Sequence, residues 1–222
     1  PNRPIIEVAD SQSIPVVVHN STDNEYLVGW QTQQPQFFND VRGRRISNAG
    51  ALIGNDFFVL GEGGGGGGGG NEFSMAYNPS NNEYMVTGRG GGEIRGRRVS
   101  HTGSLLGSGE IHISPPSIAA PNGQVIYNPN ANEYLATWRA GLETVRNLQG
   151  QLLLANGTLL GNELIISPLF PESSRYTSTG IFDPTNDRYL EVFGEFQENK
   201  IFGQFISSSG QLIGTNFAIA TN

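Results

Sequence analysis

The sequence contains no cysteine and a single lysine, Lys200, and these absences narrow the chemistry that the chain can carry. Without cysteine there are no disulfides, no thiolate zinc sites and no cysteine nucleophile. The formal net charge of -7 argues against nucleic-acid binding, which depends on a basic surface. No apolar run reaches membrane-spanning length, so the chain is not expected to span a membrane. The lack of cysteine fits a bacterial exported protein and a cytosolic protein equally well.

Turn-forming residues are abundant, with 31 glycines and 12 prolines in 222 residues. This length suits one large all-β domain or two small ones, and it can bury a sizeable core without covalent cross-links. No convincing amphipathic helix is present, because residues 143–155 align better with strands of the repeat than with a helical pattern. The chain begins at Pro1 instead of Met, so a processed, trimmed or incomplete N-terminus is expected.

Two sequence anchors recur along the chain at intervals of about 50 to 58 residues, which indicates tandem structural units. The first anchor is a turn followed by a tyrosine that starts a strand: Asn24-Glu25-Tyr26, Asn82-Glu83-Tyr84, Asn132-Glu133-Tyr134 and Asp187-Arg188-Tyr189. The second is a glycine pair: Gly50/Gly54, Gly103/Gly107, Gly157/Gly161 and Gly210/Gly214. A further glycine precedes each pair: Gly43, Gly96, Gly150 and Gly203.

Each unit reads as four short strands joined by turns. The first strand ends at a turn that Asn-Pro or Asp-Pro initiates, as in Asn78-Pro79 and Asp183-Pro184. The second strand starts at the tyrosine and is apolar on both faces, which predicts burial on both sides. The third strand carries the single glycine, which predicts a bulge or a close backbone approach. A Ser-x-x-Gly hairpin leads to the fourth strand.

Four-stranded units in tandem predict an all-β fold, a β-propeller built from four antiparallel blades. The pattern Asn-Pro-x-x-Asn-Glu-Tyr-Leu-x-x-Trp, then Gly-[Arg/Gln], then Gly-x-Leu-[Ile/Leu]-Gly, resembles the repeats of exported bacterial β-propeller-type proteins. The resemblance covers nearly the whole chain and specifies a fold better than a function. Four blades also resemble the hemopexin-like architecture, although no hemopexin motif is present. We place the blades at 11–60, 71–114, 122–167 and 175–221 of one domain, 1–222.

The sequence leaves open whether these blades close a ring. Residues 1–10 hold an extra strand, Ile6-Glu7-Val8-Ala9, which aligns with the fourth strand of the last unit, although that unit is already complete. Either four blades close the ring and this strand is an additional flank, or the chain is part of a propeller with five or more blades. A β-sandwich or a prism is the remaining alternative.

Two glycine runs interrupt the pattern, Gly63–Gly70 between the first two units and Gly90–Gly92 in the second. The longer run reads as a flexible linker or as positions whose residue identity is unassigned. A phosphate-binding loop is not predicted, because no Gly-Lys-Ser/Thr motif follows and no helix starts there.

Residues with catalytic potential show no recognisable arrangement. The three histidines have no metal-ligand spacing and are interpreted as surface or half-buried residues: His19, His101 and His112. A recurrent glutamate occupies equivalent positions, which indicates a structural role, since a catalytic pair usually breaks repeat symmetry: Glu25, Glu83 and Glu133. The non-repeated acids are interpreted as solvated surface groups: Asp40, Glu143, Glu191 and Glu195. None of these residues is predicted to be a catalytic residue, a metal ligand or part of a cofactor site.

Two sets of residues are candidates for ligand contact. Arg44, Arg45, Arg97 and Arg98 occupy equivalent places on third strands and could hold a sulfate, a phosphate or an acidic glycan. The alternative, which we favour, is cross-strand pairing with Glu25 and Glu83. Trp30 and Trp138 would be sugar-stacking platforms if they are exposed. Their equivalence to Phe193 favours a place in the core between blades.

These observations favour a non-enzymatic binding or scaffold module that is extracellular, at the cell surface or periplasmic. Its partner would be a protein or a surface glycan, not nucleic acid, and it would need no cofactor. A lectin-like glycan-binding propeller is the first alternative, and a carbohydrate-active enzyme is the second. An enzyme predicts one unrepeated acidic pocket, a lectin predicts repeated exposed aromatic groups, and a scaffold predicts neither.

Overall fold

The computed structural model describes residues 4–5, 11–33, 39–61, 73–116, 123–141, 145–167, 170–171, 178–195 and 200–220, and every regular element among them is a β-strand. Of residues 1–10, where the extra strand is expected, the structure describes only Pro4 and Ile5. The glycine run Gly63–Gly70 and Glu143 also lie outside the described ranges.

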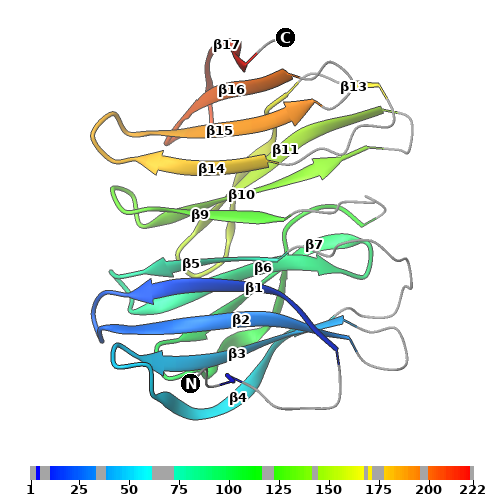
Figure 1. Cartoon of the computed structure of the whole chain (residues 1–222). Coiled ribbons are helices and arrows are strands. Elements are labelled where there is room, and N and C mark those ends of the chain that lie inside the picture. Colours follow the sequence, from blue (N-terminus) through cyan, green and yellow to red (C-terminus); the bar gives the residue numbers. More distant parts are fainter. Residues whose placement is uncertain are drawn as a thin grey trace.

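The strands form four separate antiparallel sheets, which we number as blades 1 to 4 (Figure 1). Blade 1 contains β1 Ser11–Asn20, β2 Glu25–Gln33, β3 Asn39–Ser47 and β4 Leu52–Gly61. Blade 2 contains β5 Ser74–Asn78, β6 Glu83–Gly90, β7 Glu93–Ser100 and β8 Leu105–His112. Blade 3 contains β9 Gln124–Asn128, β10 Glu133–Ala140, β11 Val145–Leu154 and β12 Leu159–Ile165, with the short β13 Phe170–Pro171 paired to β11. Blade 4 contains β14 Ser178–Asp183, β15 Arg188–Glu195, β16 Lys200–Ser207 and β17 Leu212–Ala220.

The recurrent asparagines form the turn between the first and second strands. Asn24, Asn82 and Asn132 adopt positive φ angles of 53, 49 and 54°, a conformation that asparagine tolerates better than most residues. The asparagine that ends the first strand caps the same turn, since the Asn20 side-chain oxygen accepts backbone N–H groups of Thr22 and Asp23 at 2.9 Å. The repeat motif therefore encodes one tight turn per blade.

The same asparagines also link neighbouring blades. Nδ2 of Asn20 donates to Oδ1 of Asn82 at 3.0 Å and to the Tyr84 hydroxyl at 3.1 Å, both in the next blade. Nδ2 of Asn78 donates to Oδ1 of Asn132 at 2.8 Å in the same way. Buried polar groups are stable only when they are paired, so these contacts fix the position of one blade on the next.

The structure confirms the bulge that was predicted at the mid-strand glycine. The register between third and fourth strands shifts beside Gly43 and beside Gly203, as a bulge requires. A side chain at Gly203 would meet the Phe217 ring at 2.5 Å, and one at Gly43 would meet Phe57 at 3.1 Å. The glycine therefore makes room for an apolar side chain of the fourth strand.

The hydrophobic core is divided into three layers, one between each pair of neighbouring blades. Second-strand tyrosines face the preceding blade: Tyr84 lies in the layer between blades 1 and 2, Tyr134 in that between blades 2 and 3, and Tyr189 in that between blades 3 and 4. The alternate residues, such as Leu27 and Leu135, face the following blade. The second strands of blades 2 and 3 are thus buried on both faces, as predicted, whereas those of blades 1 and 4 are covered on one face.

The blades are stacked in chain order, with blades 2 and 3 separating blade 1 from blade 4 (Figure 1). Their first strands lie side by side, β1 next to β5, β5 next to β9 and β9 next to β14. The described sheets therefore form an open stack, and closure of a ring by these four blades, including a hemopexin-like ring, is not the arrangement found. Separate sheets packed face to face in series also exclude a single β-sandwich or prism.

Candidate functional site

Arg45 and Arg98 are bound to the glutamates of the neighbouring strand. Nε of Arg45 donates to Oε1 of Glu25 at 2.6 Å, and a terminal nitrogen donates to Oε2 at 2.9 Å. Arg98 donates to the two oxygens of Glu83 at 3.2 and 2.7 Å. Both glutamates are buried, so the pairs neutralise charges that would be unfavourable to bury alone. The predicted cross-strand pairing is present, and it occupies these guanidinium groups.

Arg44 and Arg97 lie on the opposite faces of the same strands, because successive side chains of a strand alternate. The guanidinium of Arg44 donates to the carbonyl oxygens of Ile5 and Gly54 at 2.8 and 2.9 Å. Nε of Arg97 is buried without a hydrogen-bond partner among the described residues. The candidate arginines are thus divided between two blades and two faces, and the structure does not bring them together in one anion or glycan site.

Both tryptophans are buried. Trp138 is enclosed between blades 2 and 3, in the layer that contains Met85 and Ile94. Trp30 lies beside Val28 on the free face of blade 1 and lines a small cavity of about 200 Å³. A sugar-stacking role required exposed rings, so the structure does not support that role for either tryptophan.

Glu191 on β15 is completely buried between blades 3 and 4. Its Oε1 accepts a hydrogen bond from the Thr137 hydroxyl at 3.2 Å, whereas Oε2 has no partner among the described residues. Burial raises the pKa of Glu191 to about 8, and the Thr137 hydrogen bond offsets this only in part. The prediction that Glu191 is a solvated surface group is wrong. The repeat could have indicated this burial, because the equivalent positions of the other blades hold the apolar residues Val28, Val86 and Ala136.

A perturbed pKa often marks a functional group. Glu191, however, is shut off from solvent by the described residues around it, so we assign it no catalytic role. The burial of Glu191 affects the stability of the fold instead, because a carboxyl group buried in this way stays protonated over a wide pH range.

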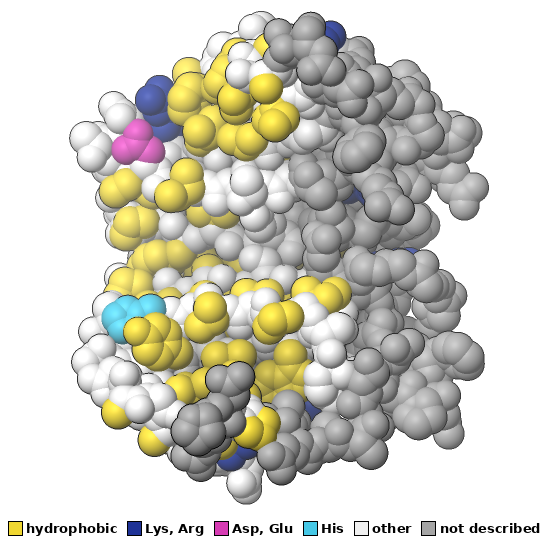
Figure 2. Space-filling model, viewed as in Figure 1, with side chains coloured by type: hydrophobic (Ala, Val, Ile, Leu, Met, Phe, Trp, Pro, Cys, Tyr) yellow, Lys and Arg dark blue, Asp and Glu magenta, His cyan; other side chains and the backbone are white. Residues whose placement is uncertain are grey.

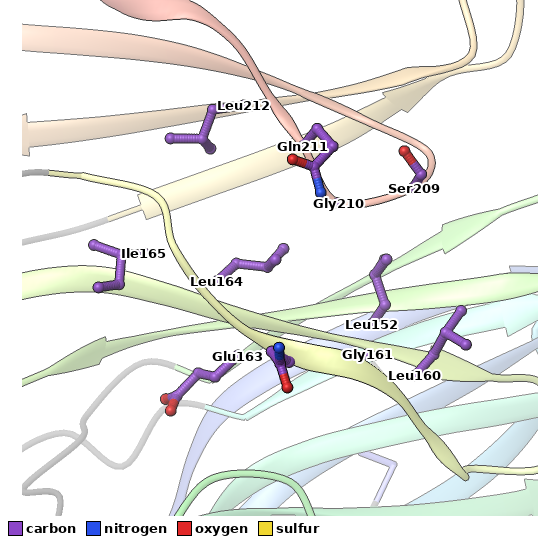
Figure 3. A pocket seen from close by; sticks show the side chains of 11 residues that line it. Leu152, Leu160, Gly161, Glu163, Leu164, Ile165, Ser209, Gly210, Gln211 and Leu212 are labelled. Carbon is purple, nitrogen blue, oxygen red and sulfur yellow. The ribbon is translucent and has the colours of Figure 1, made fainter.

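A groove runs along the rim between blade 3 and the β16–β17 hairpin of blade 4 (Figure 3). It consists of two adjoining cavities of about 610 and 500 Å³ that share Leu152, Leu160 and Ser209 among their lining residues. Figure 3 shows Leu152 and Leu160 between β12 and the hairpin, whereas Glu163 points away from the hairpin. Leucine side chains of blade 3 thus line the groove opposite Ser209 and Gln211 of the hairpin.

Glu133 lines the smaller cavity and is the only repeat glutamate without an arginine partner. Its strand equivalents Glu25 and Glu83 are paired with arginine, but position 152 of blade 3 holds leucine. No hydrogen bond or ion pair to the Glu133 carboxylate is found in the part of the chain that the structure describes. Partial burial raises its pKa. The missing arginine partner of Glu133 could have been predicted from the sequence, since Leu152 aligns with Arg45 and Arg98.

The histidines lie apart from one another, as expected from their spacing. Their partners, in chain order, are the Tyr26 ring, the Asp23 carboxylate and the Glu93 carboxylate. Within the described ranges, no three histidine, cysteine, aspartate or glutamate side chains are placed so that they could hold a metal ion. The same ranges contain no helix of the length and apolarity needed to cross a membrane.

Comparisons with known proteins identify the fold alone. No family model and no curated protein sequence matches the chain. Among solved structures, an endo-arabinase from Bacteroides thetaiotaomicron VPI-5482 superposes with a TM-score of 0.53 at 9% identity, covering 94% of this chain and 81% of the enzyme. The β-propeller domain of Nup133 from Vanderwaltozyma polyspora gives a TM-score of 0.47 at 9% identity, covering 95% and 76% of the two chains. An ACO/RPE65 chimera gives 0.48 at 10% identity, covering 96% and 52%.

The likeness to the endo-arabinase, together with four repeated four-stranded sheets, shows an all-β fold of the β-propeller type, as predicted from the repeat. At 9% identity it carries no information on activity.

Proposed function

We propose that this chain is a non-enzymatic scaffold module of the extracellular space, cell surface or periplasm, and that it assembles by stacking a further blade on its end faces. The observation that supports this proposal is that both ends of the stack expose side chains that the internal interfaces bury. Large exposed apolar patches in soluble proteins commonly mark sites of protein association.

The free face of blade 4 is apolar (Figure 2). Ile181 on β14 is 66% exposed, whereas Ile126, at the same register position of β9, is 7% exposed because blade 4 covers it. Ile201 and Ile219 are 42% and 51% exposed, whereas their counterparts in blade 3, Leu148 and Ile166, are buried. Blade 4 therefore presents the same kind of surface that blades 1 to 3 bury against their following blade.

The free face of blade 1 is the other half of such an interface. Tyr26 is 37% exposed, whereas the equivalent Tyr84, Tyr134 and Tyr189 are completely buried against a preceding blade. Val17 on β1 is 60% exposed. Within the described ranges, no blade covers this face of blade 1 as a preceding blade covers each later one.

A second copy of the chain is the partner that these two faces fit. Blade 4 of one copy would meet blade 1 of the next, in the order in which blades follow one another within the chain. Polar groups also match, because Asp183 stands where Asn20 and Asn78 donate to the next blade. Asn24 and Tyr26 carry hydrogen-bond donors, and the Asp183 carboxylate can accept hydrogen bonds from them. The contact would be heterologous, so it would build a ring or an open array.

We expect the chain to self-associate with increasing concentration in sedimentation velocity, and an Ile181→Lys variant to sediment as a monomer. A lysine at this position of the blade 4 face would place a charge in a buried apolar interface, which is strongly unfavourable. Ile165→Lys is the matched control, since Ile165 is 63% exposed but lies on blade 3, away from the end faces. A wild-type chain that stays monomeric at all accessible concentrations would count against the proposal.

A further inference from the structure

The interface between blades 2 and 3 shows how this fold holds a guanidinium group at its rim. Arg98 is bound to Glu83 of its own blade, and its third nitrogen donates to the carbonyl oxygen of Asn156 at 3.4 Å. Asn156 belongs to the hairpin of the following blade, directly before Gly157. One cation is therefore held between a carboxylate and a hairpin carbonyl of two different blades.

The interface between blades 3 and 4 has the same surroundings without the guanidinium. Glu133 stands where blade 2 has Glu83, and Ser209 stands before the hairpin Gly210 as Asn156 stands before Gly157. Leucine replaces the arginine at position 152. What remains is a cavity of about 500 Å³ that Glu133, Leu152, Leu160, Ser208 and Ser209 line.

The cavity favours a positive charge. Glu133 has no partner among the described residues, and no described lining residue of this cavity is basic. A second acid, Asp187 in the turn between β14 and β15, lies next to this hairpin and accepts hydrogen bonds from Ser208 and Asn130. An unpaired, half-buried carboxylate with an acid nearby attracts a cation more strongly than a fully solvated one.

We propose that this cavity, which we call the rim pocket, binds the guanidinium group of an arginine side chain that a partner polypeptide presents. The neighbouring interface supplies the argument for arginine over lysine, because Arg98 makes a two-point contact with its glutamate and reaches a carbonyl with its third nitrogen. Leu152 and Leu160 offer an apolar wall for the methylene stem of the ligand. The rim pocket is separate from the end faces, so its occupation does not depend on self-association.

The test is an NMR titration of the ¹⁵N-labelled Ile181→Lys chain with Nα-acetyl-arginine methylamide, with the citrulline analogue as the neutral isostere. We expect saturable shifts at the amides of Leu152, Ser208 and Ser209 with the arginine compound and none with citrulline. Glu133→Gln should weaken binding by about 10- to 100-fold, the effect of losing hydrogen bonds to a charged acceptor. Equal shifts with both compounds, no saturation, or unchanged affinity in Glu133→Gln would each overturn the proposal.

Two further variants sharpen the result. Leu152→Arg restores the pair that blades 1 and 2 contain, so it should abolish binding while keeping the fold, and retained binding would overturn the proposal. Glu163→Gln removes an acid of the same blade whose side chain points away from the hairpin (Figure 3), so it should leave the affinity unchanged. Loss of binding in Glu163→Gln equal to that in Glu133→Gln would show general electrostatic attraction instead of a rim pocket. If Leu152→Arg fails to fold, Glu133→Gln still decides the question.

Discussion

Raising the pH from 5 to 8 is expected to lower the free energy of unfolding by about 3 kcal/mol through Glu191 alone. The carboxyl group lies in the layer between blades 3 and 4, where Thr137 is its hydrogen-bond donor. Gly180 of β14 leaves the space that it occupies, since any side chain at this position would overlap with the Glu191 carboxyl and Ile126. The group therefore has no room to turn toward water.

The direction of the effect follows from the raised pKa. The ordinary value for glutamate is 4.5 and the buried group has a pKa of about 8. Between these values the native carboxyl keeps its proton while the unfolded chain loses it, so the unfolded state binds fewer protons. The stability is fully present below about pH 4.5 and is lost as the pH rises through 8. The lowered pKa values of exposed aspartates act only below about pH 4: Asp23, Asp183 and Asp187.

Urea unfolding of the Ile181→Lys chain between pH 5 and 8.5 measures this dependence in a monomer. Glu191→Gln keeps the side-chain volume and cannot ionise, so its unfolding free energy should change by less than about 1 kcal/mol over that range. Asp56→Asn is the control, because Asp56 is partly exposed in a surface ion pair with Arg42 and should leave the slope as it is. An unchanged slope in Glu191→Gln would show that the carboxyl is hydrated in the native state.

Gly157→Ala is expected to destabilise the chain by about 2–5 kcal/mol, for two separate reasons. Its φ of 91° lies in the left-handed region, where a β-carbon costs about 1–2 kcal/mol. The added methyl group would also overlap with Ile111 of blade 2, against which this hairpin packs. An overlap of that kind in a packed interface costs about 1–3 kcal/mol more.

Gly161→Ala separates the two contributions. Gly161 has a φ of 70°, and no atom lies within 4 Å of the position that its β-carbon would take. Its substitution should therefore cost only about 1–2 kcal/mol, the backbone contribution. Combining Gly157→Ala with Ile111→Ala should recover part of the packing loss in a double-mutant cycle. Equal effects of the two single glycine substitutions would mean that the hairpin does not press on blade 2.

The sequence predicted those parts of the fold that every blade repeats. Asn82 and Tyr84 recur because each blade needs one left-handed turn residue, and because the second-strand tyrosine of each later blade packs its ring against the preceding blade. Selection for the same contact in each unit makes such residues visible without a structure. The paired glutamates and arginines became interpretable for the same reason, since Glu25 and Arg45 lie on adjacent strands at fixed positions of the unit.

The candidate sites were hidden because they are departures from the repeat. Glu191 was interpreted as solvated because acids usually are, and only its register position between buried aromatic residues places it inside. The rim pocket depends on Leu152, an ordinary residue in a strand, whose meaning comes from the arginine that it replaces. Whether the blades close could not be read from the sequence either, since closure depends on the small angle between successive sheets.

The division of the core into three layers makes this molecule behave as a short one-dimensional chain of units. Blades 2 and 3 each have two neighbours, while blades 1 and 4 have one, so the end blades carry fewer stabilising contacts. Thermal opening should therefore begin at either end and advance blade by blade toward β9 and β10. Addition of another unit at an end would raise the stability of the blade that it covers, which couples assembly to the rigidity of the whole array.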